Sequence, residues 1–174
     1  GLFPNLARHA DDLCVLRGMH TDLPNHPQAF VQLHTGNFQF VRPSLGAWAV
    51  YGLGTENQDL PGFITISAPG RLGGKQNYGS SFLPAFYQGT AIGQERASIK
   101  DAKLRNLSNK ELTPELQRKQ LDLVQAMNRD LLKEQPANPD IEGVIESFEL
   151  GFRMQSAVPK VMGIADEPKA IQDM

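Results

Sequence analysis

Two short runs of this chain are almost entirely apolar, and helical spacing of apolar residues accounts for most of the remainder. Residues 13–19 are nearly continuous in apolar character, which predicts a buried strand. Residues 63–66, Phe-Ile-Thr-Ile, predict a second strand from their aromatic and β-branched content. Helical patterns separate the two runs, and strands joined in this way favour a parallel sheet. The pattern therefore predicts an α/β protein.

Helix start and stop signals are clear in the first part of the chain. A short helix is expected over residues 4–10, beginning at a proline. Asn25 or His26, followed by Pro27, marks the start of a second helix, which ends at Gly36. These signals place a loop between the first predicted strand and the second helix.

The middle of the chain passes from a third helix into glycine-rich sequence. Ser44 caps this helix and Gly54 ends it. Residues 57–62 form a turn before the second strand. Residues 68–93 carry six glycines, which predicts a long surface loop. A loop of this length is more often functional than filler, and disorder is the alternative interpretation.

Two longer helices are predicted in the last third of the chain. Thr113-Pro114 starts the first, and Gln135-Pro136 stops it. Asn138-Pro139 starts the second. Because both helices carry apolar residues at helical spacing, we expect an antiparallel hairpin packed along one face. The apolar positions of the second helix are Ile141, Val144, Ile145, Phe148 and Phe152.

Composition excludes several classes of protein. The 174 residues are 40% hydrophobic and 21% charged, which is ordinary for a globular protein. A net charge of -2 gives no electrostatic footprint for nucleic acid. No run of apolar residues is long enough for a membrane span, and no leader of signal-peptide type is present in the sequence. The single cysteine, Cys14, lies within the first apolar run and is predicted to be a buried strand thiol.

The strongest candidate for a binding site is the sequence HTDLPNHPQAFVQLHTG, residues 20–36. A helix start exposes unpaired backbone N–H groups and the positive end of the helix dipole, and both suit a sulfate or phosphate group. We therefore expect Asn25 and His26 to contact an anion. In the alternative interpretation, Asn25 and His26 cap the helix while Thr21 and Asp22 bond the loop backbone.

Histidines and aspartates cluster in the sequence but not in a spacing that predicts a closed metal site. His9 is expected on the polar face of the first helix and His34 near the end of the second. His20, Asp22 and His26 share one loop. Because a metal site requires several side chains to converge on one ion, these residues are expected to complete a site only together with others.

The loop GRLGGKQNYG, residues 70–79, resembles a phosphate-binding loop only superficially, because Gln76 follows Lys75 where a serine or threonine is required. Arg71 and Lys75 are candidates for contact with an anionic substrate if this loop folds over residues 20–26. A plain solvated loop is the alternative.

Residues 38–66, FQFVRPSLGAWAVYGLGTENQDLPGFITI, carry a resemblance to a known family. They resemble the bacterial proteins grouped as domain of unknown function 1501, relatives of the sulfatase and alkaline phosphatase superfamily. The resemblance extends to both ends of the chain. It implies a partial alkaline-phosphatase-like three-layer fold, with an α/β part over residues 1–100 and a helical hairpin lobe over residues 101–174. It also implies that the chain is an interior piece of a longer, exported protein.

The same resemblance implies a metal-dependent hydrolase of sulfate or phosphate esters. Thr35-Gly36 matches a pair that ends the helix after the nucleophile in this superfamily. In sulfatases the nucleophile lies a fixed number of residues before such a pair, and that spacing leads to His26 in this chain. A second sequence pattern of the superfamily places Asp22, next to Thr21, at the nucleophile position. Neither residue is the expected nucleophile. Thr21, Asp22 and His26 are therefore the catalytic candidates, with the Thr21 hydroxyl as the replacement nucleophile.

Cofactors and partners follow from this resemblance as expectations. Zinc or calcium is expected in the intact protein, and no metal in this piece alone. The partner is then an anionic ester substrate. A non-catalytic family member that binds an anionic glycan or a protein is the alternative, because the standard nucleophile is missing. Core surface left uncovered in a partial fold predicts self-association.

Overall fold

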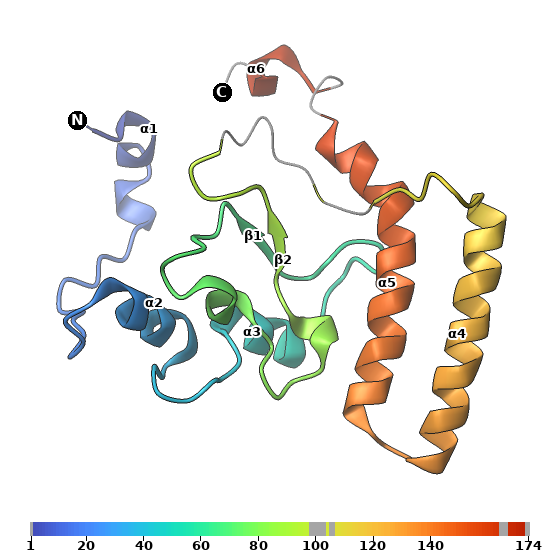
Figure 1. Ribbon diagram of the computed structural model, residues 1–174. Helices are drawn as coiled ribbons and strands as arrows, with labels where there is room; N and C mark the ends of the chain where they lie inside the picture. The colour runs from blue at the N-terminus through green and yellow to red at the C-terminus, as the bar shows by residue number, and fades with distance from the viewer. Residues whose placement is uncertain (1, 98–103, 105–106, 164–166, 173–174) are drawn as a thin grey trace.

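The computed structural model describes residues 2–97, 104, 107–163 and 167–172, and Figure 1 shows its elements. The regular secondary structure of the described chain consists of helices and one parallel pair of strands, so the predicted mixture of α and β structure is confirmed. The elements in chain order are α1 Pro4–Ala7, η1 Ala10–Asp12, α2 His26–Thr35, α3 Leu45–Leu53, β1 Ile64–Ile66, η2 Gly74–Tyr78, η3 Ala85–Tyr87, β2 Thr90–Ile92, α4 Pro114–Glu134, α5 Pro139–Met162 and α6 Lys169–Gln172, where η marks a 3-10 helix.

The prediction of a strand over residues 13–19 is wrong. Leu13 has extended backbone dihedrals, but residues 13–19 join no strand ladder, and Val15 is 70% exposed. Cys14 is exposed rather than buried. An apolar run becomes a strand only when another strand accepts its backbone hydrogen bonds. In the part of the chain that the structure describes, β1 and β2 pair with each other instead.

The helices α2 and α3 begin and end where the sequence predicts. Asn25 accepts a hydrogen bond from the backbone N–H of Gln28, at 3.1 Å, and caps α2. Gly36 ends this helix with a φ of 75°, a left-handed conformation that favours glycine. Ser44 caps α3 in the same way as Asn25 caps α2. Local capping chemistry thus fixes both helices.

The glycine-rich region is ordered, so the prediction of a long loop without regular structure is wrong. It contains η2, η3 and β2, and Asn77, Ser80 and Leu83 are buried within it. Gly73 has a φ of +85°, and a Cβ at this position would lie 2.7 Å from Val31 of α2. The glycine therefore permits the close approach of η2 to α2. These segments pack because their glycines remove side-chain bulk at the contacts.

The sheet is parallel, as predicted, but the strand that pairs with β1 is β2 and not the strand predicted over residues 13–19. Ile64 of β1 pairs with Thr90 of β2, and Ile66 pairs with Ile92. The connection between the strands runs through η2 and η3. Tyr51 of α3 stacks edge-on against Tyr87 of η3, with ring centroids 5.3 Å apart. The glycine-rich region is therefore the centre of the α/β part.

The helical hairpin is confirmed. In Figure 1, α4 lies alongside α5, and α5 separates α4 from the α/β part. Arg118 near the start of α4 pairs with Glu149 near the middle of α5, whereas Gln125 farther along α4 bonds Ile145, earlier in α5. This order shows that the two helices are antiparallel. The contact between α5 and η3 joins the hairpin to the α/β part.

The buried core is small for the described part of the chain. Its apolar members are Val31, Ala47, Val50, Leu83, Leu150 and Val158. Many large apolar side chains are exposed, including those of residues 13–19 and several on α4. None of the described helices is both long and apolar enough to cross a membrane.

Candidate functional site

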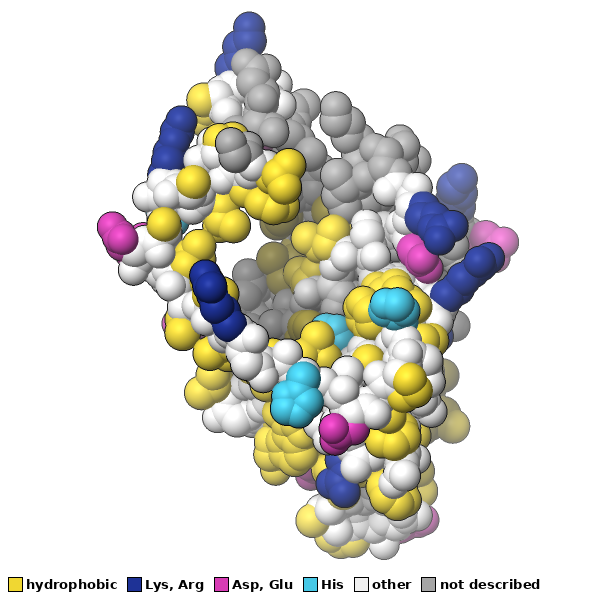
Figure 2. Space-filling view, turned by 90° about the vertical axis from the view of Figure 1, so that its left-hand side faces the viewer, with side chains coloured by type: hydrophobic (Ala, Val, Ile, Leu, Met, Phe, Trp, Pro, Cys, Tyr) yellow, Lys and Arg dark blue, Asp and Glu magenta, His cyan; other side chains and the backbone are white. Residues whose placement is uncertain are grey.

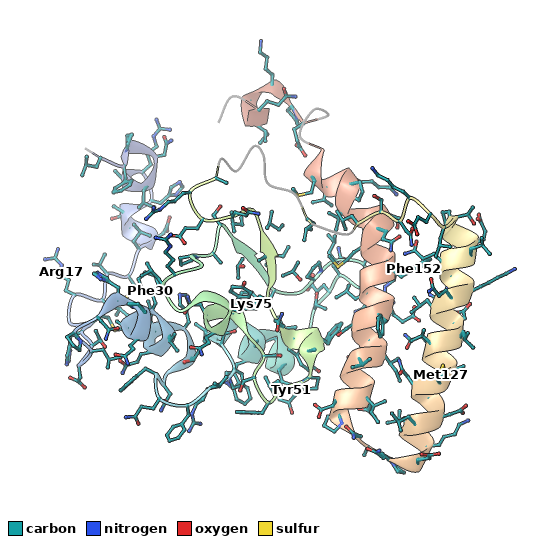
Figure 3. The ribbon with its side chains drawn as sticks, viewed as in Figure 1. Arg17, Phe30, Tyr51, Lys75, Met127 and Phe152 are labelled. Carbon is teal, nitrogen blue, oxygen red and sulfur yellow. The ribbon has the colours of Figure 1, made fainter. Side chains whose placement is uncertain are left out.

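The candidate site lies on the segment that precedes α2 together with the first turn of that helix. We refer to residues 17–28 as the α2 leading segment. Figure 3 shows Arg17 on the loop that runs toward α2. Thr21, Asp22, Asn25 and His26 are all exposed along the segment. The predicted catalytic residues are therefore accessible, although they do not form a closed pocket.

The Thr21 hydroxyl is fixed by its neighbours. Its Oγ1 donates to Gln32 Oε1 of α2 at 2.7 Å and accepts from the backbone N–H of Leu23 at 3.3 Å. An amide oxygen does not remove a proton from a hydroxyl as a histidine or a metal-bound base does. The bond from the Leu23 N–H is the loop-backbone contact that the structural interpretation of Thr21 predicts, and the bond to Gln32 anchors the segment to α2. Neither partner is a base that would activate the hydroxyl.

The first turn of α2 leaves two backbone donors without a protein acceptor. Asn25 Oδ1 accepts from the backbone N–H of Gln28, and Asn25 Nδ2 donates to Gln28 Oε1, so the Asn25 side chain bonds both the backbone and the side chain of Gln28. The N–H of Ala29 bonds the carbonyl of Asn25 at 3.2 Å, and Pro27 has no N–H. Within the described chain, the backbone N–H groups of the capping residue Asn25 and of His26 have no acceptor, and that of His26 belongs to the helix itself.

Of the two residues predicted to contact an anion, His26 therefore keeps an open donor, whereas the Asn25 side chain is used in the cap. Asn25 caps the helix, as the structural interpretation expects, while His26 presents an open N–H at the positive end of a ten-residue helix. Figure 2 shows the left-hand face of the molecule as hollowed, with histidine, basic and hydrophobic side chains around the hollow. Asp22, an exposed carboxylate four positions before His26, opposes an anion electrostatically.

The remaining histidines are dispersed. His9 lies beyond the end of α1 and pairs with Asp12 at 3.6 Å, while the His34 ring lies near Phe30 in the last turns of α2. Among the described residues, no group of three or more His, Cys, Asp or Glu side chains is placed to hold a metal ion. The described residues thus supply no such group of metal ligands on their own, and the zinc or calcium that the resemblance implies for the intact protein stays a prediction.

Arg71 and Lys75 lie in the glycine-rich region, and both are exposed. Lys75 lines a cavity of about 370 Å³ between this region and α5, together with Tyr78, Ser147 and Met154. None of residues 21–26 lines that cavity. The Gly70 N–H next to Arg71 bonds Glu95 Oε2 at 2.9 Å, so a carboxylate already lies beside this part of the loop.

A polar cluster between α4 and α5 was not predicted from the sequence. Arg118 bonds both carboxylate oxygens of Glu149 at 2.9 Å each, and Gln125, fully buried, donates to Glu149 and to the Ile145 carbonyl. The Arg118 guanidinium also lies 4.9 Å from the centre of the Phe152 ring. Hydrogen bonds from Arg118 lower the pKa of Glu149 to about 2. This cluster holds α4 and α5 together in the hairpin.

The fold and the candidate site together define a mixed α/β protein with a parallel strand pair, a helical hairpin and an exposed polar segment before a capped helix. The family model described as "Protein of unknown function (DUF1501)" matches residues 1–174, so the chain belongs to this family. No curated protein and no solved structure matches the chain. The function must therefore be argued from the residues of this chain.

Proposed function

We propose that the α2 leading segment binds the anionic group of a sulfate or phosphate ester and does not itself cleave the ester. The observation that carries this proposal is the open N–H of His26 at the start of α2. Helix starts with open N–H groups attract sulfate and phosphate because partial positive charge is concentrated there. Arg17, on the same segment, adds a full positive charge. The contact is consistent with recognition of an anionic glycan or of an anionic protein partner.

Hydrolysis of the same ester is the second candidate function. It is favoured by the exposure of Thr21, Asp22 and His26 on one segment, and by the relation of the family to sulfatases and alkaline phosphatases that the sequence resemblance implies. In that case the chain forms part of an alkaline-phosphatase-like three-layer fold in a longer, exported protein. We derive no step through a metal, because the described residues do not supply its ligands. The engaged Thr21 hydroxyl favours binding over cleavage.

Two substitutions at one position test the proposal. His26→Pro removes the open N–H, and proline is well tolerated at the first position of a helix when the preceding residue is extended, as Asn25 is. His26→Ala removes the imidazole but keeps the N–H, so it is the matched control. We expect His26→Pro to weaken binding of 4-nitrophenyl sulfate in calorimetry by about tenfold, since a hydrogen bond to a charged group contributes about 1.5 kcal/mol or more.

Turnover of the same ester, followed by release of 4-nitrophenol with and without added zinc or calcium, separates the two functions. Binding without turnover supports the recognition role. Turnover that is abolished by Thr21→Ala would instead establish hydrolysis with Thr21 as nucleophile. Equal affinity of the wild type, His26→Ala and His26→Pro would contradict an anion site at the start of α2.

A further inference from the structure

The helix α4 leaves a row of apolar side chains exposed. Leu116, Leu123, Met127 and Leu131 are 51%, 65%, 66% and 42% exposed, and we call them the α4 stripe. Such a row on one helix, with no cover within the described chain, is typical of a surface that binds another helix. The stripe lies on the element farthest from the α/β part, as Figure 1 shows.

Helical geometry places the stripe on a single face. Its members follow one another at intervals of seven, four and four residues, which return to nearly the same direction at 3.6 residues per turn. The face is about 22 Å long at 1.5 Å per residue. It is distinct from the face that α4 turns toward α5, where Gln125 is fully buried.

A groove between α4 and α5 continues the apolar surface of the stripe. It encloses about 510 Å³ and is lined by Gln117, Leu121 and Val124 of α4, and by Phe148 and Phe152 of α5. Phe148 is 48% exposed at its edge. A row of side chains beside a groove is the geometry by which helices interdigitate in bundles. The hairpin therefore presents an apolar helix face on α4 that a further helix can cover.

The charges that border the stripe identify its partner. Along the polar edge of α4 beside the stripe, the charges run negative, positive, negative and positive at Glu115, Lys119, Asp130 and Lys133. Within one chain Lys133 pairs with Asp130 at 2.8 Å, and both side chains are more than 70% exposed, so this pair can rearrange when a second helix approaches. When a second α4 lies antiparallel, Glu115 faces Lys133 of the other copy, and Lys119 faces Asp130. The midpoints of both pairs fall at residues 124–125, close to the middle of the stripe. The charges along this edge are therefore complementary to those of the same edge on a second, antiparallel copy.

We propose that α4 pairs antiparallel with α4 of a second copy of this chain, about a two-fold axis near residue 124, so that the two hairpins join through their α4 helices, with each α5 on the far side of its own α4. The same residues then form both sides of the interface, as in most two-fold dimers. Four charge pairs lie along its rim, two on each side of the axis. The apolar stripe supplies the buried centre, and the charges select the antiparallel register.

The first test is the mass of the 174-residue chain in solution, measured by sedimentation equilibrium over a range of concentrations. The wild type is expected to associate to a dimer, and Leu123→Glu to be monomeric at the same concentrations. Leu33→Glu is the matched control, because Leu33 is also 65% exposed but lies on α2; this variant is expected to remain dimeric. Circular dichroism shows whether each variant retains the wild-type helix content.

The second test addresses the orientation of the two helices. Lys119→Glu places like charges opposite each other twice and is expected to raise the dimer dissociation constant about tenfold, since each exposed pair contributes a few tenths of a kcal/mol to about 1 kcal/mol. Lys119→Glu combined with Asp130→Lys restores opposite charges and is expected to recover most of the affinity. A monomeric wild type, a monomeric Leu33→Glu with normal helix content, or a double variant no tighter than the single one would overturn the proposal.

Discussion

At the scale of single residues, the α2 leading segment shows how one sequence pattern supports two interpretations. Residues that suit an anion site also suit a helix cap, because both roles require polar groups next to unpaired N–H donors. In the structure Asn25 caps the helix and Thr21 is bonded to Gln32, which leaves the His26 N–H open. Sequence alone shows which groups are present, whereas the allocation of hydrogen bonds depends on the folded geometry.

Asp22 allows the electrostatics of the proposed anion site to be tested. Its exposed carboxylate lies four positions before His26, so it repels an anion bound at the start of α2. Asp22→Asn is therefore expected to tighten the binding of inorganic sulfate by a few-fold at low ionic strength, as measured by calorimetry, and the gain should diminish as salt is added. Weaker binding by this variant would indicate that the carboxylate contributes to the site.

Glu149 makes the stability of the chain dependent on pH at the acid end. Its folded-state pKa is about 2, below the usual value of 4.5 for a glutamate, because Arg118 donates to both carboxylate oxygens. A depressed pKa contributes stability above the unfolded value, and that contribution is lost as the pH falls from about 4.5 toward 2. The shift corresponds to an upper value of about 3 kcal/mol for this partly exposed side chain.

Glu149→Gln is therefore expected to lower the free energy of unfolding by about 2 kcal/mol at pH 6 and to make much less difference near pH 2. Denaturant titrations across this range provide the measurement. Asp122→Asn is the control, because Asp122 also pairs with Arg118 but is 62% exposed, and exposed pairs contribute little. A loss that is equal at both pH values would show that packing, rather than the charge, is responsible.

At the scale of elements, the helices could be predicted from the sequence and the strands only in part. Caps and stops such as Ser44, Asn138 and Gly36 act within a few residues, so helix boundaries follow from local chemistry. Strands depend on partners elsewhere in the chain. The apolar run of residues 13–19 lacks a ladder, whereas β2 forms within a region whose glycines indicated a loop. The hairpin was predictable because its helices are adjacent in the chain.

Replacing each of the two glycines within α5 by alanine is expected to change the stability of the chain in opposite directions. A Cβ at Gly143 would lie 2.5 Å from Pro84 Cβ, whereas nothing lies within 4 Å of a Cβ at Gly151. Gly151→Ala is expected to raise the free energy of unfolding by up to about 1 kcal/mol through helix propensity. Gly143→Ala is expected to lower it by about 1 to 3 kcal/mol, because α5 and η3 must separate.

Thermal denaturation of both variants, with the wild type in parallel, tests this contact. Stabilisation by alanine at both positions would mean that Pro84, the residue before η3, does not pack against α5 as the structure shows.

At the scale of the whole molecule, the hairpin and the α2 leading segment lie in separate parts of the structure. Figure 1 shows the chain preceding α2 and the helix α4 on opposite sides of the α/β part. A dimer formed through α4 therefore leaves the leading segments of both copies accessible. Two anion sites held in one particle would strengthen binding to a partner that carries repeated anionic groups, such as a sulfated glycan, through a raised effective concentration.

This arrangement predicts that Leu123→Glu leaves the affinity for inorganic sulfate unchanged but weakens binding to a surface coated with sulfated polysaccharide. Surface plasmon resonance at several coating densities measures the second quantity. Loss of sulfate affinity in the same variant would show that the two parts are not independent.

Binding of an anion at the start of α2 through the His26 N–H can be followed residue by residue by nuclear magnetic resonance. Backbone amide shifts are recorded while inorganic sulfate is added to the ¹⁵N-labelled chain at constant ionic strength. A saturable shift is expected that is largest at the His26 amide and smaller at its neighbours. Shifts that do not saturate, or that are largest at Lys75 in the glycine-rich region, would rule out the proposed site.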